Sequence, residues 1–227
     1  MTVAYLIHLA NYSDGVLYAL ATLLLVALAV MLDRFWFLRR TILRGGRLVA
    51  EVGAHATLGM PELASLRDKA GALPEGALLA TAHDHMDLKF DALESRLDET
   101  IMLIAPRLDG GLWVLDTIVT LSPLLGLFGT ILGMFHAFSV LAVPGHAPTA
   151  VTGGVANALV ATASGIFIAM LGLVAFNALS NRVRLVIHQL DTLKTMVMNR
   201  SAPGTMALRP GAAGGMTSLH AVAAAGE

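Results

Sequence analysis

The chain has 227 residues, of which 56% are hydrophobic and only 14% are charged, with a mean hydropathy of +0.71. Soluble domains carry about 25% charged residues, so this composition argues against a soluble globular protein. With 15 basic and 16 acidic residues the net charge is −1, which gives no reason to expect a nucleic-acid partner. The absence of cysteine excludes disulfides, thiolate metal sites and thiol catalysis.

A first stretch without Asp, Glu, Lys or Arg, residues 15–32, predicts a transmembrane helix near the N-terminus. Such a helix needs roughly 20 mostly apolar residues, and we place it at 15–38. It ends in the segment DRFWFLRR, whose arginines and aromatics suit the headgroup region. Because residues 1–13 contain no Lys or Arg, the basic start of a cleaved signal peptide is missing, and we expect the helix to be retained.

The region 39–112 is predicted to be helical rather than a separate folded domain. Its apolar residues recur in steps of three and four, which marks one face of a helix; they are Met86, Phe90, Leu93, Leu97, Ile101, Ile104 and Leu108. We expect this stripe to pack on shorter helices within 47–72 or on a neighbouring subunit. Pro106 and the pair Gly110–Gly111 are expected to bend the chain after it.

The short segment HDHMD could be drawn as a metal site, since it contains His83, Asp84, His85 and Asp87. On a helix, however, His83 and Asp87 share a face while His85 points nearly the other way. We therefore interpret the segment as a solvated helix face, and we predict no metal and no cofactor.

A second uncharged stretch, residues 117–181, is long enough for two spans. Pro144, Gly145 and Pro148 form a helix break near its middle. We therefore predict a second span at 113–140, a turn at 141–150 and a third span at 151–180. A helix extension is expected at 181–200, and the aperiodic, turn-rich segment 201–227 is expected to be disordered.

Basic residues set the predicted orientation, because they concentrate in cytoplasmic loops. All 15 lie within Arg34–Arg107 or Arg182–Arg209. We therefore expect the segment 1–14 and the turn at 141–150 to face the periplasm. The region 39–112 and the C-terminus are expected to face the cytoplasm.

Span two has small residues along one face. Gly126, Thr130 and Gly133 follow at i, i+4 and i+7, and Gly129 with Gly133 makes a GxxxG. Small residues let helices approach closely in lipid, so packing alone is the simpler interpretation of the glycines. Pro123 predicts a kink, with Ser122 or a water satisfying the freed carbonyl.

Span three is also rich in small residues, and Gly165 is a candidate for helix packing. Asn157 should face other helices or a wet lumen, because an unpaired amide in lipid is costly. A lone membrane threonine such as Thr162 usually bonds back to its own helix. Neither span contains a carboxylate, so a proton relay would need a titratable group from another chain.

Two runs together carry a family resemblance: PLLGLFGTILGMFHAF at 123–138 and GGVANALVATASGIFIAMLGLVAFN at 153–177. They resemble the paired signature of the MotA/TolQ/ExbB proton-channel family, and DRFWFLRR is similar to these proteins too. The resemblance implies a ring of five subunits around two copies of a single-span, ExbD- or TolR-like partner. The partner's aspartate would gain and lose a proton beside Thr130 and Thr162, which match the family's lumen-lining threonines.

The sequence departs from that family pattern at two positions. Asn157 stands where many ExbB and TolQ proteins have a glutamate, and Leu171 stands where the family tends to have proline. Asparagine can form hydrogen bonds but cannot carry a proton. The asparagine at position 157 therefore affects how protons or water would pass this point of the span, and neither departure affects the expected fold.

We therefore predict an all-α integral membrane protein with three transmembrane helices and long helices extending into the cytoplasm. The resemblance implies an ExbB-like subunit of a proton-driven motor in the bacterial inner membrane, with a TonB- or TolA-like protein as a further partner. A TolQ-like role and a non-conducting scaffold remain alternatives. There is no P-loop, GxGxxG or nucleophile elbow, so we expect no enzyme.

Overall fold

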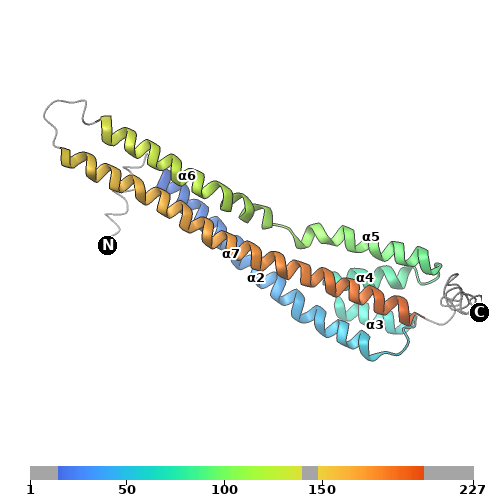
Figure 1. Ribbon diagram of the computed structural model, residues 1–227. Helices are drawn as coiled ribbons and strands as arrows, with labels where there is room; N and C mark the ends of the chain where they lie inside the picture. The colour runs from blue at the N-terminus through green and yellow to red at the C-terminus, as the bar shows by residue number, and fades with distance from the viewer. Residues whose placement is uncertain (1–14, 140–147, 202–227) are drawn as a thin grey trace, which may run out of the picture. The chain divides into compact units, whose positions relative to one another are not determined.

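The computed structural model describes residues 15–139 and 148–201. In chain order its helices are α2 (Val16–Ala54), α3 (Met60–Ala70), α4 (Pro74–Asp84), α5 (Phe90–Leu108), α6 (Leu112–Ser139) and α7 (Pro148–Arg200), as Figure 1 shows. Within the described segments the only β pairing is an isolated bridge between Leu58 and Ser201. The segment 1–14, residues 140–147 of the predicted turn region and residues 202–227 of the predicted tail lie outside the described residues.

Three of these helices are long and apolar enough to cross a membrane. The most apolar windows of α2, α6 and the part of α7 from Thr152 have mean hydropathies of 2.4, 1.9 and 2.3. The prediction of an all-α membrane protein with three spanning helices is confirmed. Pro148 opens α7, where a missing N–H costs no helical hydrogen bond, so this helix begins slightly before the predicted third span.

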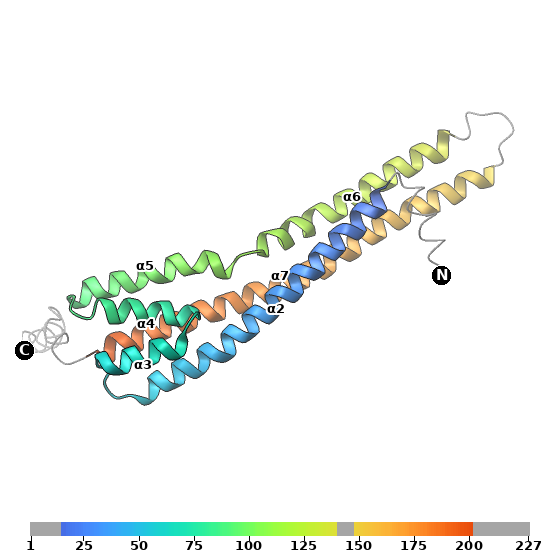
Figure 2. The same cartoon turned by 180° about the vertical axis from the view of Figure 1, so that it is seen from behind.

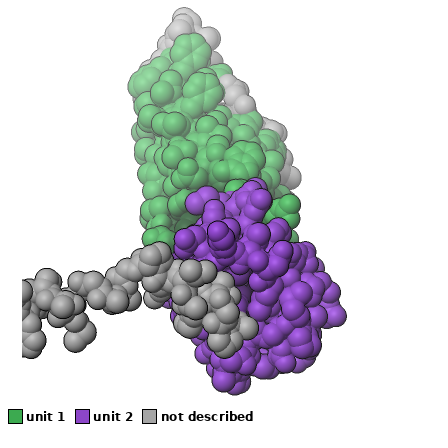
Figure 3. Space-filling view, turned by 90° about the vertical axis from the view of Figure 1, so that its right-hand side faces the viewer, with its two compact units in different colours: residues 1–40, 106–185 green, residues 41–105, 186–227 purple. Residues whose placement is uncertain are grey.

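The chain divides into two compact units, coloured separately in Figure 3. The described residues of the first are 15–40, 106–139 and 148–185, and we call it the apolar unit. The described residues of the second are 41–105 and 186–201, and we call it the polar bundle. Helices α2 and α7 contribute residues to both.

The core of the apolar unit is formed by α2, α6 and α7. Val16, Leu20 and Ala27 of α2 are buried with Ile118 of α6 and Ile168 of α7. On the outer surface large apolar side chains are exposed, for example Phe135 at 68% and Val174 at 71%. A helix that is apolar both inside and outside its bundle is typical of a membrane span.

Glycines separate α5 from α6. Gly111 has φ +83, a conformation that other residues rarely adopt, and the next helix starts at Leu112. The guanidinium of Arg34 fills the space that side chains at Gly110 and Gly111 would need. Pro106 lies inside α5, which continues to Leu108, so the break before the second span comes from the glycines rather than from the proline.

A cation–π contact in the same unit joins α7 to α2, where the Arg182 guanidinium lies 4.3 Å from the centre of the Phe35 ring. Arginine and aromatic side chains together are typical of a membrane–water interface.

The polar bundle buries the apolar stripe predicted in the sequence. Leu93, Leu97, Ile101 and Ile104 of α5 are buried, as are Val186, Leu190, Leu193 and Val197 of α7. The hydroxyl oxygens of Thr81 in α4 and Thr100 in α5 are 2.9 Å apart. Helices α3 and α4 form a hairpin whose turn contains Gly71 at φ +55 (Figure 2).

The helical interpretation of HDHMD holds for His83 and Asp84 but was wrong for the three residues after them. Helix α4 ends at Asp84, and the Leu88 N–H bonds the His85 carbonyl at 3.1 Å in the turn that follows. Instead, His83 Nδ1 and Asp84 Oδ1 lie 3.0 Å apart, and the ring of His85 bonds the Thr81 carbonyl. This contact with His83 lowers the pKa of the exposed Asp84 carboxyl.

Candidate functional site

The contact between α6 and α7 in the apolar unit is lined by glycine, and we call Gly126, Gly129, Gly133 and Gly165 the glycine seam. A Cβ at Gly126 would lie 3.0 Å from the Thr162 Cα, and one at Gly133 would lie 2.6 Å from the Ala158 Cβ. A Cβ at Gly165 would overlap the Ser122 carbonyl oxygen. The two backbones are therefore packed as closely as only glycine allows.

Two hydroxyl groups meet in this seam. Thr162 Oγ1 donates across the helix pair to the Gly126 carbonyl at 2.9 Å, whereas Thr130 Oγ1 donates to the Leu127 carbonyl of its own helix at 2.6 Å. The two hydroxyl oxygens are 3.4 Å apart. Thr130 is 7% exposed and Thr162 is half-buried. The structure thus brings together the two threonines that the sequence singled out.

Asn157 is not part of this pair. Its side chain is half-buried, and it precedes Ala158, the residue that packs on Gly133. The hydrogen bonds of Thr130 and Thr162 do not include it.

Ser122 was not recognised as a site residue from the sequence. It is completely buried, and its Oγ has no hydrogen-bond partner among the described residues, so it does not satisfy a carbonyl freed by Pro123. Helix α6 continues through Pro123. Its spacing could have identified it, because Ser122 precedes Gly126 by four residues and so lies on the same face of α6 as the glycine seam.

The seam has hydroxyls but no ionisable carboxyl. No Asp, Glu, Lys or Arg occurs in residues 117–181. Asp116 is exposed at the start of α6, and Asp33 pairs with Arg34 at 3.6 Å. A threonine hydroxyl can donate to a carboxylate or accept from a carboxylic acid. The seam can therefore solvate a carboxyl group in either protonation state, but it cannot carry a proton as a titratable group.

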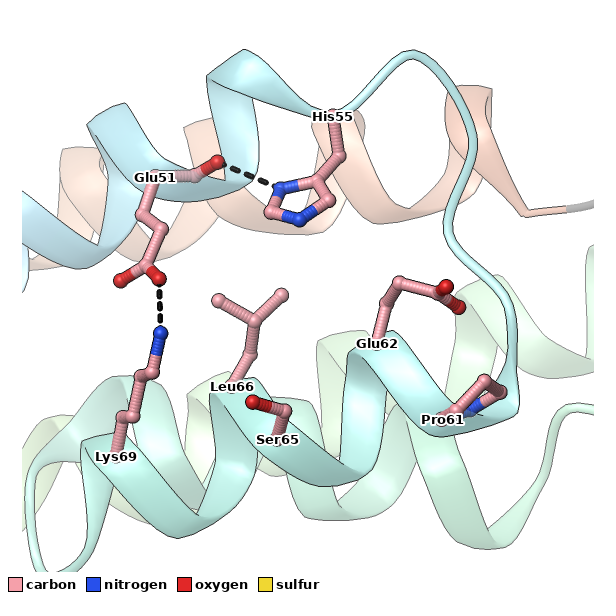
Figure 4. A pocket seen from close by; sticks show the side chains of 7 residues that line it. All are labelled: Glu51, His55, Pro61, Glu62, Ser65, Leu66 and Lys69. Atoms are coloured by element: carbon pink, nitrogen blue, oxygen red, sulfur yellow. Dashed lines mark hydrogen bonds and ion pairs between the residues drawn. The ribbon is translucent and has the colours of Figure 1, made fainter.

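The polar bundle contains a pocket of about 260 Å³ (Figure 4). It is lined by Glu51, His55, Pro61, Glu62, Ser65, Leu66 and Lys69. Several of its polar groups already have partners: Lys69 pairs with Glu51, the His55 ring bonds the Glu51 carbonyl, and Glu62 accepts the N–H of Gly59 at 3.0 Å. Within the described residues no group of three His, Cys, Asp or Glu side chains could hold a metal ion.

Three apolar spanning helices, two of them in close, hydroxyl-bearing contact, define an integral membrane protein with a tightly packed helix pair. Comparison with known families makes the class specific. The model of the MotA/TolQ/ExbB proton channel family matches residues 72–192, and the chain belongs to this family. The resemblance read from the two span motifs is confirmed.

Curated relatives agree with this assignment. The chain is similar to the putative biopolymer transport protein ExbB-like 1 of Synechocystis sp., with 29% identity over 78% of this chain and 70% of that protein. It is 36% identical to the biopolymer transport protein ExbB of Neisseria gonorrhoeae over 40% of this chain and 41% of that one. It is 32% identical to the Tol-Pal system protein TolQ of Pseudomonas aeruginosa over 59% of this chain and 53% of that one. The matches to the last two therefore span only about half of their length or less.

Proposed function

We propose that this chain is the multi-spanning subunit of a proton-motive-force-driven motor in the bacterial inner membrane, with an ExbB-like role in energising outer-membrane transport. One observation carries the proposal: the paired hydroxyls of Thr130 and Thr162 lie at a close helix contact in a member of a proton channel family.

The missing carboxylate supports a need for a partner. An intramembrane proton path normally requires a titratable group, and residues 117–181 contain no carboxylate. We propose a ring of five copies that encloses a single-span, ExbD- or TolR-like chain, whose aspartate lies beside Thr130, Thr162 and Asn157. A TonB- or TolA-like protein would receive the resulting force.

The proposed topology has a periplasmic N-terminus and a cytoplasmic C-terminus. It is supported by the confinement of all 15 basic residues to Arg34–Arg107 and Arg182–Arg209. The Arg182–Phe35 contact is of the type found at a membrane surface, and it lies at the basic end of the spans.

A TolQ-like role in envelope maintenance is the second candidate, because TolQ proteins are among the relatives. The two roles differ in the protein that receives the force rather than in the proton path.

A non-conducting scaffold of the same fold is the competing class. It is favoured by the fact that Thr130 and Thr162 both donate to carbonyls of this same chain. Asn157, which cannot titrate, also favours it. A scaffold would tolerate valine at both threonines without functional loss, whereas a channel would not.

The experiment is to purify the tagged chain from its native membrane by gentle extraction and to measure the native mass and composition of the complex. We expect five copies holding a single-span chain with an aspartate in its span. An oligomer without such a chain would leave the seam without a titratable group and would replace the motor with the scaffold.

A further inference from the structure

Glu75, in the first turn of α4, is a carboxyl group buried without a partner in the polar bundle. Its exposed fraction is 0%, and neither carboxylate oxygen has a hydrogen-bond partner among the described residues. An ion buried in this way is very unfavourable, whereas a neutral carboxyl needs only one acceptor for its proton. The proposed motor gives this group no task.

The position of Glu75 follows from the packing of α4 on α2. Leu78, Leu79 and Ala82 of α4 are buried on the same face as Glu75. A Cβ at Gly45 of α2 would overlap the Glu75 carboxyl group. Gly45 therefore provides the space in which the carboxyl lies directly against the α2 backbone.

The same bundle contains a second buried and unsatisfied oxygen, on α7. The side-chain oxygen of Gln189 in α7 is buried and has no hydrogen-bond partner in the described part of the chain. The Gln189 Nε2 lies 3.5 Å from the point that a Cβ at Gly46, the residue after Gly45, would occupy. The Gln189 side-chain oxygen has no donor partner among the described residues, and a protonated Glu75 carries an O–H that can donate. An ionised Glu75 would have only acceptors, and neither of its oxygens has a donor partner among the described residues.

No charged side chain in the surrounding helices neutralises Glu75. The nearest ones along α2, Arg44 and Arg47, are exposed, and so is His188 beside Gln189 in α7. On α4 itself the next titratable groups are His83 and Asp84, two turns further on and paired with each other. On α3 the charged groups nearest the turn are Asp68 and Lys69, which pair with Arg67 and with Glu51.

We propose that Glu75 is a proton-binding site that holds α4 against Gly45 of α2 when it is neutral and loosens this contact when it ionises. The packing of the polar bundle then responds to the pH of the compartment that contains it.

The direction of the pH effect follows from burial. Desolvation by burial raises the pKa of the Glu75 carboxyl and outweighs the opposing effect of its own backbone N–H. A carboxyl whose pKa is raised on folding stabilises the bundle fully below its ordinary pKa. That contribution is lost as the pH rises through the raised value.

The direct test is infrared spectroscopy of the full-length protein in lipid nanodiscs, comparing wild type with Glu75→Gln. We expect the carbonyl stretch of a neutral carboxylic acid at neutral pH, its loss at alkaline pH, and its absence in Glu75→Gln. The matched control Asp91→Asn changes an exposed carboxyl of α5 and should leave the band intact. A Glu75 that is ionised at neutral pH, or neutral at every pH, would overturn the proposal.

Hydrogen exchange of the α4 amides tests the structural consequence. After correction for the intrinsic rate, wild-type protection should fall as the pH rises, whereas Glu75→Gln should stay protected because glutamine cannot ionise. Gly45→Ala should lower α4 protection at every pH, since the added methyl displaces the carboxyl. Equal pH dependence in wild type and Glu75→Gln would overturn the proposed switch.

Discussion

At the scale of single residues, glycine and threonine have different tasks in the contact between α6 and α7. The glycines set how closely the backbones approach, because a side chain at Gly165 would meet a carbonyl oxygen that cannot move without moving α6. The threonines provide the polar groups, of which Thr162 alone donates across the helix pair. Substitutions at the glycines should therefore change mainly stability, and substitutions at the threonines should change mainly function.

Because the glycines allow α6 and α7 to pack closely, we expect Gly165→Ala to destabilise the apolar unit by about 1–3 kcal/mol, the usual cost of overpacking. Gly153→Ala is the matched control in the same helix, since its added Cβ meets no atom within 4 Å. It should leave stability within about 0.5 kcal/mol or raise it slightly. Thermal unfolding of both variants in the same detergent measures the difference. Equal stability of the two would mean that the seam is not tightly packed.

Because valine removes the hydrogen bond from Thr162 to Gly126, we expect Thr162→Val to lose about 0.6 kcal/mol of stability, the average for a hydrogen bond between membrane helices. Its loss of proton-driven activity should be far larger, because valine cannot bond a carboxyl group in either state. Thr162→Ser keeps the hydroxyl and should retain most activity. Full activity of the valine variant in a well-folded complex would favour the scaffold.

At the scale of helices, the polar bundle is held by an ion-pair network between α5 and α7. Lys194 lies 2.7 Å from Asp98 and 3.2 Å from Glu94, with its own side chain 15% exposed. Burial alone would lower the pKa of Lys194, but hydrogen bonds and charge from Asp98 and Glu94 outweigh it and raise this pKa. The stabilisation is present below the ordinary lysine pKa and is lost as the pH rises through the raised value.

Lys194→Met should therefore reduce bundle stability by roughly 1 kcal/mol at neutral pH, a value kept small because both carboxylates are partly exposed. Lys69→Met is the control, because Lys69 pairs with Glu51 at a more exposed site. Denaturant unfolding should show that the difference in unfolding free energy between wild type and Lys194→Met is smaller at strongly alkaline pH than at neutral pH. A constant difference would contradict the assigned role of the charge.

The helices also show how far a sequence alone predicts this structure. The spans follow from charge-free stretches, since lipid leaves few alternatives to an apolar helix. The turn after Asp84 did not follow, because HDHMD contains neither glycine nor proline to mark it. Spacing placed Gly126, Thr130 and Gly133 on one face, but the pairing of Thr162 with Gly126 depends on the register between helices. Nothing in the sequence marks Glu75 as buried.

At the scale of the whole molecule, membership of a proton channel family and the absence of a carboxylate from residues 117–181 point to an assembly. Exposed apolar side chains such as Leu124, Leu127 and Phe128 on α6 can face lipid or neighbouring copies, whereas the hydroxyl pair requires a partner to become a proton path.

Proton flux tests this account most directly. The complex purified from native membranes and the chain purified alone would be reconstituted into liposomes with a pH-sensitive dye inside. Under an imposed proton-motive force we expect acidification with the complex, little with the chain alone, and a strong reduction in a complex carrying Thr162→Val. An intact complex that passes no more protons than protein-free liposomes would contradict the proposed function.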